Sequence, residues 1–278
     1  MNYREIVPCP ALDRWVQCFW ILDGPPGPPE AIFPDGRSEI IFHFADPFRR
    51  FHPDGSSERQ PRCFLVGQMS GWARVGPAGA VGVFGIRFSP AGAAAFIGVP
   101  QSELADRFLS LDLVCGRAAK DLEQQILEAA SGRERVARAE AWLLRRLRFK
   151  ADPLVEAALD RLAVADPRLR IHALARTLQV SPRRLERRFL DRVGLTPKLF
   201  SRIVRFQNLV QAIRRPGPAD WAGLAFDCGY FDQAHLIRDF RQFAGQTPSV
   251  YCSRVDRLSD FFVEPLSDFS KTGSAARF

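Results

Sequence analysis

The sequence lacks the residues and runs from which several kinds of protein are built. Only four histidines occur in 278 residues, and the six cysteines are scattered without a Cys-x-x-Cys pair. This pattern favours reduced thiols over a zinc site or a disulfide framework. No apolar run reaches the roughly 18 residues of a membrane helix, and no basic segment leads into an apolar run with a cleavage site. We therefore expect a cytoplasmic protein with no membrane partner.

Catalytic and nucleotide-binding signatures are also missing. Neither Gly-x-Ser-x-Gly nor His-Glu-x-x-His occurs. Gly79, Gly82 and Gly85 have a three-residue spacing that fits no dinucleotide or phosphate loop, and no Lys-Ser/Thr follows them. His43 and His52 have no carboxylate at close ligand spacing, so we interpret them as core or surface histidines. The sequence predicts no enzyme, no catalytic residue, no metal and no cofactor.

Positive charge is present in excess, and it is concentrated in one region. The chain has a net charge of +8 and a pI near 9.6. Residues 168–215 hold 13 Lys/Arg and two acids, whereas residues 1–151 hold 19 basic and 17 acidic groups. Concentrated basic charge favours a polyanionic partner. At this length we expect two domains.

An arginine-rich helix is predicted from residue 181. Ser181 is a good N-cap and Pro182 suits the first helical position. Leu185 and Phe189 are four apart and share one face. Three arginines occupy or flank the opposite face: Arg183, Arg184 and Arg187. Such a helix is either a solvated surface helix or one that enters the DNA major groove.

A second copy of this stretch follows 51 residues later, which favours the DNA interpretation. The matching pairs are Leu185/Leu236, Arg187/Arg238, Phe189/Phe240, Gly194/Gly245, Thr196/Thr247 and Pro197/Pro248. Upstream the offset is 50, as in Leu174/Leu224 and Ala175/Ala225. The sequence therefore predicts two tandem helix-turn-helix units.

Six helices are predicted across this region, at residues 154–164, 171–178, 181–193, 197–213, 221–228 and 232–243. The fourth would join the two units. At 1.5 Å per residue its roughly 17 residues span about 25 Å, which could hold the units near the roughly 34 Å between successive major-groove entries.

The N-terminal half is predicted to be β-rich. Residues 15–22, 38–44, 64–66 and 80–88 read as strands, with a Pro-Asp-Gly turn at 34–36. Short strands separated by turns that contain glycine or proline favour a small barrel or sandwich. Helices are expected at 90–97, 118–130 and 133–149. The apolar stripe Val136, Ala139, Leu143 and Leu147 is either ordinary packing or a dimer seam.

The fold class is thus α+β and multidomain. We expect a β-rich domain with a helical end at 1–150, which could also carry dimer contacts, a DNA-binding domain at 152–254 and a poorly ordered tail at 255–278; the resemblance described next implies a sensor role for the first. Candidate effector-binding residues are Asp35, Glu39, His43 and Arg87, although each could equally be a turn or surface residue.

The blocks LARTLQVSPRRLERRFLDRVGLTP and LAFDCGYFDQAHLIRDFRQFAGQTPSVY resemble the AraC/XylS family of bacterial transcription regulators. The Phe-Pro-Asp-Gly-x-x-Glu-Ile-Ile-Phe stretch at 33–42 is similar to the sensor half of one group of these regulators. The resemblance implies two recognition helices in successive major grooves of bent DNA. It assigns base reading in the first helix to Arg183 and Arg187, with Glu186 nearby, and in the second helix to Gln233, Ala234, Ile237 and Arg238. Ser181 and Arg184 complete the predicted DNA-binding set.

Ala234 and Ile237 offer only apolar contact, so the second half-site should be read mainly by shape and phosphate contact. We interpret His235 as a packing or phosphate residue. Arg184 is expected at phosphate or solvent, as are four further arginines: Arg188, Arg192, Arg202 and Arg205.

The resemblance implies double-stranded DNA as a partner, with a small-molecule effector in the N-terminal domain and a nucleoid location. RNA polymerase is a further candidate partner. A homodimer could form through the N-terminal domain or residues 118–149. The alternative is a DNA-alkylation-repair or other DNA-acting enzyme with a similar DNA-binding half. A repair protein of that type needs a cysteine acceptor in a metal-binding cluster, which the cysteine spacing does not supply.

Overall fold

A computed structural model describes residues 1–148, 151–164, 169–214 and 221–253. Its strands are β1 (Asn2–Ile6), β2 (Val16–Gly24), β3 (Glu30–Ile32), β4 (Glu39–His43), β5 (Phe48–Phe51), β6 (Ser57–Arg59), β7 (Cys63–Val66), β8 (Ala73–Pro77), β9 (Val81–Phe88) and β10 (Phe108–Ser110). Its α-helices are α1 (Leu111–Cys115), α2 (Arg117–Glu128), α3 (Gly132–Arg146), α4 (Pro153–Val164), α5 (Ile171–Thr177), α6 (Pro182–Val193), α7 (Pro197–Ile213), α8 (Trp221–Asp227), α9 (Gln233–Ala244) and α10 (Pro248–Cys252). Two 3-10 turns, η1 (Ala93–Ala95) and η2 (Gln101–Glu103), follow β9.

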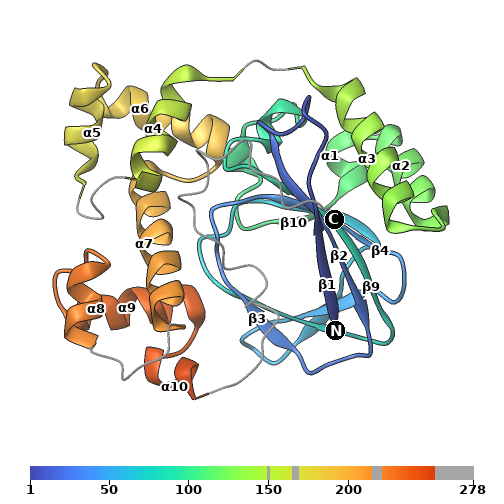
Figure 1. Cartoon of the computed structure of the whole chain (residues 1–278), viewed down its shortest axis with the longest axis horizontal. Coiled ribbons are helices and arrows are strands. Elements are labelled where there is room, and N and C mark those ends of the chain that lie inside the picture. The colour runs from blue at the N-terminus through green and yellow to red at the C-terminus, as the bar shows by residue number, and fades with distance from the viewer. Residues whose placement is uncertain (149–150, 165–168, 215–220, 254–278) are drawn as a thin grey trace.

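The N-terminal part of the chain is a sandwich of two antiparallel sheets. One sheet has the order β1-β2-β9-β4-β7-β10, and the other has the order β3-β8-β5-β6. Helices α1, α2 and α3 lie beside the larger sheet on one side of the molecule (Figure 1). The predicted β-rich fold is therefore confirmed, as two open sheets.

Strand β2 explains why the larger sheet is covered on both faces. Successive side chains of a strand point to opposite faces. Phe19 and Ile21 belong to the core beneath α2 and α3, whereas Cys18, Trp20 and Leu22 belong to the core shared with the smaller sheet. Because both faces are apolar, β2 reads as a continuous hydrophobic run.

Gly85 of β9 lies opposite Trp20 of β2, and the sheet needs a glycine there. A Cβ at this position would lie 2.0 Å from the Trp20 ring. Steric fit to an aromatic side chain therefore accounts for this glycine, without any phosphate ligand.

The helical part, α4 to α10, has its own core, in which the inward faces of both repeated units meet α7. Helices α6, α7 and α9 each begin at a side-chain cap: Ser181 accepts from Arg184 N, Thr196 from Leu199 N, and Asp232 from His235 N. Gly194 and Gly245 end α6 and α9 with φ values of 94° and 70°. L-residues with a side chain rarely adopt this left-handed conformation, so the recurring glycines mark helix ends.

The predicted helices of the C-terminal part are all confirmed, with ends within one residue or so. In the N-terminal part the helices predicted at 118–130 and 133–149 are confirmed as α2 and α3, although α3 ends at Arg146. The helix predicted at 90–97 is wrong: only the turn η1 forms. There Gly92 packs so closely on Trp15 O that a Cβ would lie 1.9 Å from it. The sequence pattern also missed α1, α10 and the strands β1, β3, β5, β6, β8 and β10. Residues 149 and 255–278 lie outside the described residues.

The α3 stripe is buried within the chain. Val136, Ala139 and Leu143 pack in the core between the helices and the larger sheet, and Leu147 is 38% exposed. Ordinary packing therefore explains most of the stripe, which leaves little of it for a dimer seam.

Candidate nucleic-acid interface and ligand cavity

Helix α6 presents an apolar face inward and an arginine face outward. Leu185, Phe189 and Val193 are buried in the core of the helical part. The predicted DNA-contacting side chains of the first unit are all exposed: Ser181, Arg183, Arg184, Glu186 and Arg187. The N-terminal part approaches this helix at its C-terminal end, where a Cβ on Gly194 would lie 2.8 Å from Gln101 O. The arginine face is therefore accessible.

Helix α9 repeats this arrangement with a less charged outer face. Leu236, Phe240 and Phe243 are buried, and Gln233, Ala234 and Arg238 are exposed. Ile237 is half-buried and packs against the core, so it is less available than its neighbours on the helix.

A groove of about 1030 Å³ lies between the two units along α7. Side chains from both recognition helices line it, including Glu186, Arg238 and Asp239, and α7 adds Lys198, Arg202 and Arg205. Helix α7 runs between α6 and α9 in Figure 1. Its 17 residues correspond to a length of about 25 Å. The groove thus combines exposed basic groups with a fixed separation of the two helices.

Several arginines expected at phosphate or solvent also hold the helices together. Arg188 binds Asp152 at 2.5 Å. Arg202 pairs with Asp239 of α9 at 2.8 Å, and Arg205 donates to Gly229 O at 3.1 Å. These contacts fix α4 to α6 and α7 to the second unit. Phosphate or solvent contact stays a prediction for these arginines, and Arg184 is exposed.

His235 lies against the protein as the sequence suggested. Its ring packs edge-on against Tyr230 at 5.3 Å, and its Nδ1 accepts from Phe231 N at 3.4 Å. Tyr230 is buried, and burial raises the pKa of its phenol. His235 thus packs on the protein at the start of α9, and it also lines the groove, so phosphate contact by this residue stays a prediction.

A second site lies between the two sheets, where a cavity of about 90 Å³ is enclosed mainly by apolar and aromatic side chains. Strands of both sheets contribute, among them Trp20 and Leu22 of β2, Phe48 of β5 and Val75 of β8. Polar side chains at the cavity wall are Asp35, Arg37, Glu39, His43 and Gln60.

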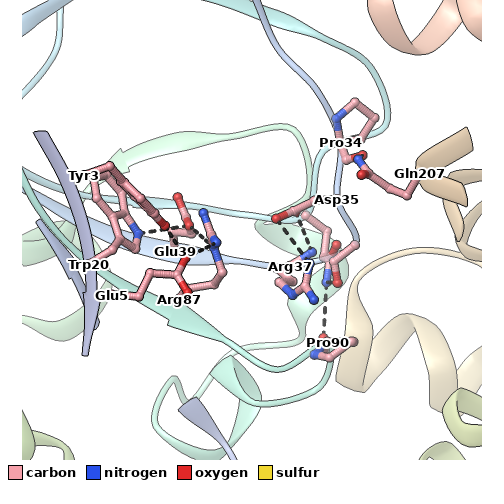
Figure 2. A network of polar contacts seen from close by, with 12 residues as sticks. Tyr3, Glu5, Trp20, Pro34, Asp35, Arg37, Glu39, Arg87, Pro90 and Gln207 are labelled. Atoms are coloured by element: carbon pink, nitrogen blue, oxygen red, sulfur yellow. Dashed lines mark hydrogen bonds and ion pairs between the residues drawn. The ribbon is translucent and has the colours of Figure 1, made fainter. Parts of the chain in front are cut away.

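Three of the four candidate effector residues line this cavity: Asp35, Glu39 and His43. Arg87 does not. It is 0% exposed and lies beside Glu39, its partner across the strands, with Nε 2.7 Å from Glu39 Oε1. Trp20 Nε1 donates to the same oxygen at 3.1 Å. Figure 2 shows this network, which extends from Arg87 to Glu5 and on to Tyr3. Burial raises the pKa of the Glu39 carboxyl, and Arg87 opposes that rise.

Arg37 and Gln60 were missed by the sequence reasoning. Arg37 follows the Pro-Asp-Gly turn, where its backbone N donates to Asp35 Oδ1 at 3.0 Å and its guanidinium lies 3.8 Å from Asp35 Oδ2. The Pro-Asp-Gly turn was the signal that could have identified Arg37. Gly36 adopts φ 78°, and its two neighbours, Asp35 and Arg37, both line the cavity. Gln60 gave no such signal.

Residues 33–37, here called the 33–37 loop, join the cavity to the helical part. Phe33 lines the cavity, and its ring lies 5.8 Å from both Phe206 of α7 and Tyr251 of α10. Pro34 O accepts a hydrogen bond of 2.6 Å from Gln207 Nε2, a contact drawn in Figure 2. Phe33 is therefore shared by the cavity wall and the core of the helical part.

The described residues contain no group of three or more His, Cys, Asp and Glu side chains that could hold a metal ion. None of the six cysteines, all of them among the described residues, forms a disulfide, and burial raises the pKa of Cys63, Cys115 and Cys9. His52 lies apart from His43, 3.4 Å from Glu58. Across the same part of the chain, none of the helices is long and apolar enough to span a membrane.

Comparison with protein families gives two separate matches, one in the β-rich part and one in the helical part. Residues 4–110 match a domain of unknown function (DUF6597), and residues 174–254 match the helix-turn-helix domain family. No curated protein matches the chain.

Among solved structures, the chain is similar to ToxT from Vibrio cholerae O395, at 10% identity and a TM-score of 0.46, over 88% of this chain and 98% of that one. Unsaturated fatty acid bound wild-type ToxT from strain SCE256 gives 12% identity and a TM-score of 0.44, over 85% and 96% of the two chains. The exposed arginine helix, its repeat and the family match lead to one identification: the chain carries an AraC-type helix-turn-helix DNA-binding domain at residues 174–254.

Proposed function

We propose that this protein is a sequence-specific transcription regulator whose two recognition helices, α6 and α9, bind successive major grooves on one face of the DNA. The observation that carries the proposal is the pair of exposed polar faces at the two units, separated by one rigid helix of about 25 Å. Successive major-groove entries are about 34 Å apart, and DNA that bends toward the protein shortens that distance.

The two units contribute unequally. Arg183 and Arg187 of α6 can each donate two hydrogen bonds to a guanine edge, a contact worth about 1–3 kcal/mol of discrimination. Helix α9 offers Arg238 and the amide of Gln233, beside the methyl group of Ala234. The first unit therefore supplies most of the base specificity, and the second supplies register and phosphate contact.

Asp152 supports a domain boundary at this residue. Its Oδ1 accepts from Leu154 N at 3.1 Å, and its Oδ2 binds Arg188 of α6. Both contacts belong to the helical part. We assign 1–150 to a β-rich effector-binding domain, 152–254 to the DNA-binding domain and 255–278 to a tail.

The effector-binding role rests on the cavity and on the 33–37 loop. A ligand that displaces Phe33 changes its packing on Phe206 and Tyr251, and so acts on α7, the helix that separates the two reading helices. Effector binding would in this way alter the spacing of α6 and α9 without contact to either outer face.

Selection of bound duplexes from a random DNA pool tests the DNA part of the proposal. We expect a recovered site with two half-sites about one helical turn apart, the first more strongly conserved among the selected sequences. Recovery of random sequences at every salt concentration would reject sequence-specific binding.

A further inference from the structure

The cavity between the two sheets holds a set of charges that already neutralise one another. Asp35 and Arg37 form one pair, and Glu39 and Arg87 form the other, with Arg87 behind the wall. An ionised ligand would have to compete with a buried partner for each charge, at a large desolvation cost. The wall therefore favours a neutral ligand.

His43 adds a ring nitrogen, Nδ1, that has no hydrogen-bond partner among the described residues. Its side chain lines the cavity and is 1% exposed. Nε2 lies 3.1 Å from Gln60 Oε1, which can only accept, so Nε2 carries the proton. Burial lowers the pKa of His43 to about 4, so the ring is neutral at pH 7 and Nδ1 is an acceptor. A buried acceptor without a partner is costly, and a ligand that donates to it removes that cost.

The ring of His43 is also held in place. It stacks between Phe48 at 5.2 Å and Phe64 at 5.6 Å. A fixed acceptor loses little freedom when a ligand binds, which favours a directed hydrogen bond.

The size of the cavity limits the ligand. At about 90 Å³ it is smaller than the 300–1,000 Å³ pockets of drug-sized ligands. It is closer to an apolar cavity of about 150 Å³ that binds benzene. A ligand of about one ring fits this space, whereas a long chain does not.

We infer that this cavity binds a small neutral aromatic molecule of about one ring whose hydroxyl or N–H donates a hydrogen bond to His43 Nδ1. The inference rests on the proposed function, in which the β-rich part binds the effector, and it names the chemical class of that effector.

Calorimetric titration of the full chain with three probes of similar shape tests it. p-Cresol is neutral and carries a donor, 4-fluorotoluene is neutral without one, and 4-methylbenzoate is an anion. We expect p-cresol to bind about tenfold more tightly than 4-fluorotoluene, the ratio that about 1.4 kcal/mol of hydrogen bonding gives, and 4-methylbenzoate to bind most weakly.

His43→Phe keeps an aromatic ring and removes the acceptor, so p-cresol should then bind no better than 4-fluorotoluene. His52→Phe is the matched control, because His52 lies in the same β-rich part but outside the cavity wall. It should leave all three affinities unchanged. The wild-type comparison of probes remains decisive if His43→Phe does not fold.

Equal binding of p-cresol and 4-fluorotoluene, tightest binding of the anion, an unchanged preference in His43→Phe, or no binding of any probe at millimolar concentration would overturn the inference. DNA binding without added probe is measured separately, on a labelled duplex from the selected pool. Duplex binding with no probe binding would remove the ligand class alone, and probe binding without duplex binding would remove the proposed regulator.

Discussion

Replacing Phe33 with alanine tests whether the 33–37 loop connects the cavity to the DNA-binding domain. Phe33 is 5% exposed and packs on Phe206 and Tyr251. An aromatic side chain buries about 150–250 Å², which corresponds to about 4–6 kcal/mol at about 25 cal/mol/Å² as an upper bound. Measured Phe-to-Ala costs in cores are about 3–5 kcal/mol. Phe48→Ala is the matched control, because Phe48 is also 5% exposed and lines the same cavity, but belongs to the core between the sheets.

Hydrogen exchange of backbone amides distinguishes the two variants, since it reports local opening element by element. A local loss of about 3 kcal/mol raises exchange about a hundredfold, at 1.4 kcal/mol per factor of ten. We expect Phe33→Ala to raise exchange in α7 and α10, whereas Phe48→Ala should raise it in β5 and β8. If α7 exchanges equally fast in both variants, or is unchanged in Phe33→Ala, Phe33 does not act as the connection.

Three further outcomes are expected. Arg187→Ala should cost about 1–3 kcal/mol of DNA-binding free energy and relax the base preference at one position in a selection experiment. Arg176→Ala is the control, because Arg176 is also exposed but lies on α5, and it should leave base preference unchanged. The same relaxation in both variants would contradict base reading by Arg187. If six phosphates are neutralised, the logarithm of the DNA affinity should fall with the logarithm of salt concentration with a slope of about −5, and a slope near zero would exclude electrostatic binding. The pKa of His43 is about 4 in the folded chain against 6.5 in the unfolded chain, so the unfolded chain binds more protons between these values. The free energy of unfolding should therefore fall as pH falls through this window, by up to about 3 kcal/mol. Urea unfolding at pH 7 and pH 4.5 should show a smaller loss of stability in His43→Phe than in the wild type, and an equal loss would contradict the buried neutral ring.

The helices of the DNA-binding domain could be predicted because their signals are local. Ser181 caps the helix whose start it predicted, and Asp232, its counterpart in the repeat, caps α9; Gly194 and Gly245 end these two helices. Caps and apolar spacing act within a turn or two of the chain, and the 51-residue repeat gave each signal twice.

The β-rich domain was less predictable, because its partners lie far apart in the sequence. Short strands such as β5 and β6 carry no alternation of their own, and the sheet order depends on long-range pairing. Asp35, Glu39 and His43 were chosen for their chemistry, and the sheet brings them to one cavity. Arg87 was chosen for the same reason but pairs with Glu39 behind the wall, a relation that only the strand register determines.

Helix α7 is the element through which a small displacement can affect both reading helices. Arg202 and Arg205 tie its middle to the second unit, and Phe200 packs on Phe189 of α6 at 5.5 Å. The 33–37 loop contacts the same helix through Phe206 and Gln207. In the proposed function, packed helices shift as rigid bodies by about 1–2 Å, so a change in the loop would be transmitted to both units together. Both helices would then have to fit their grooves at one separation, so we expect the arginine-rich α6 to use its contacts fully only while α9 stays in register.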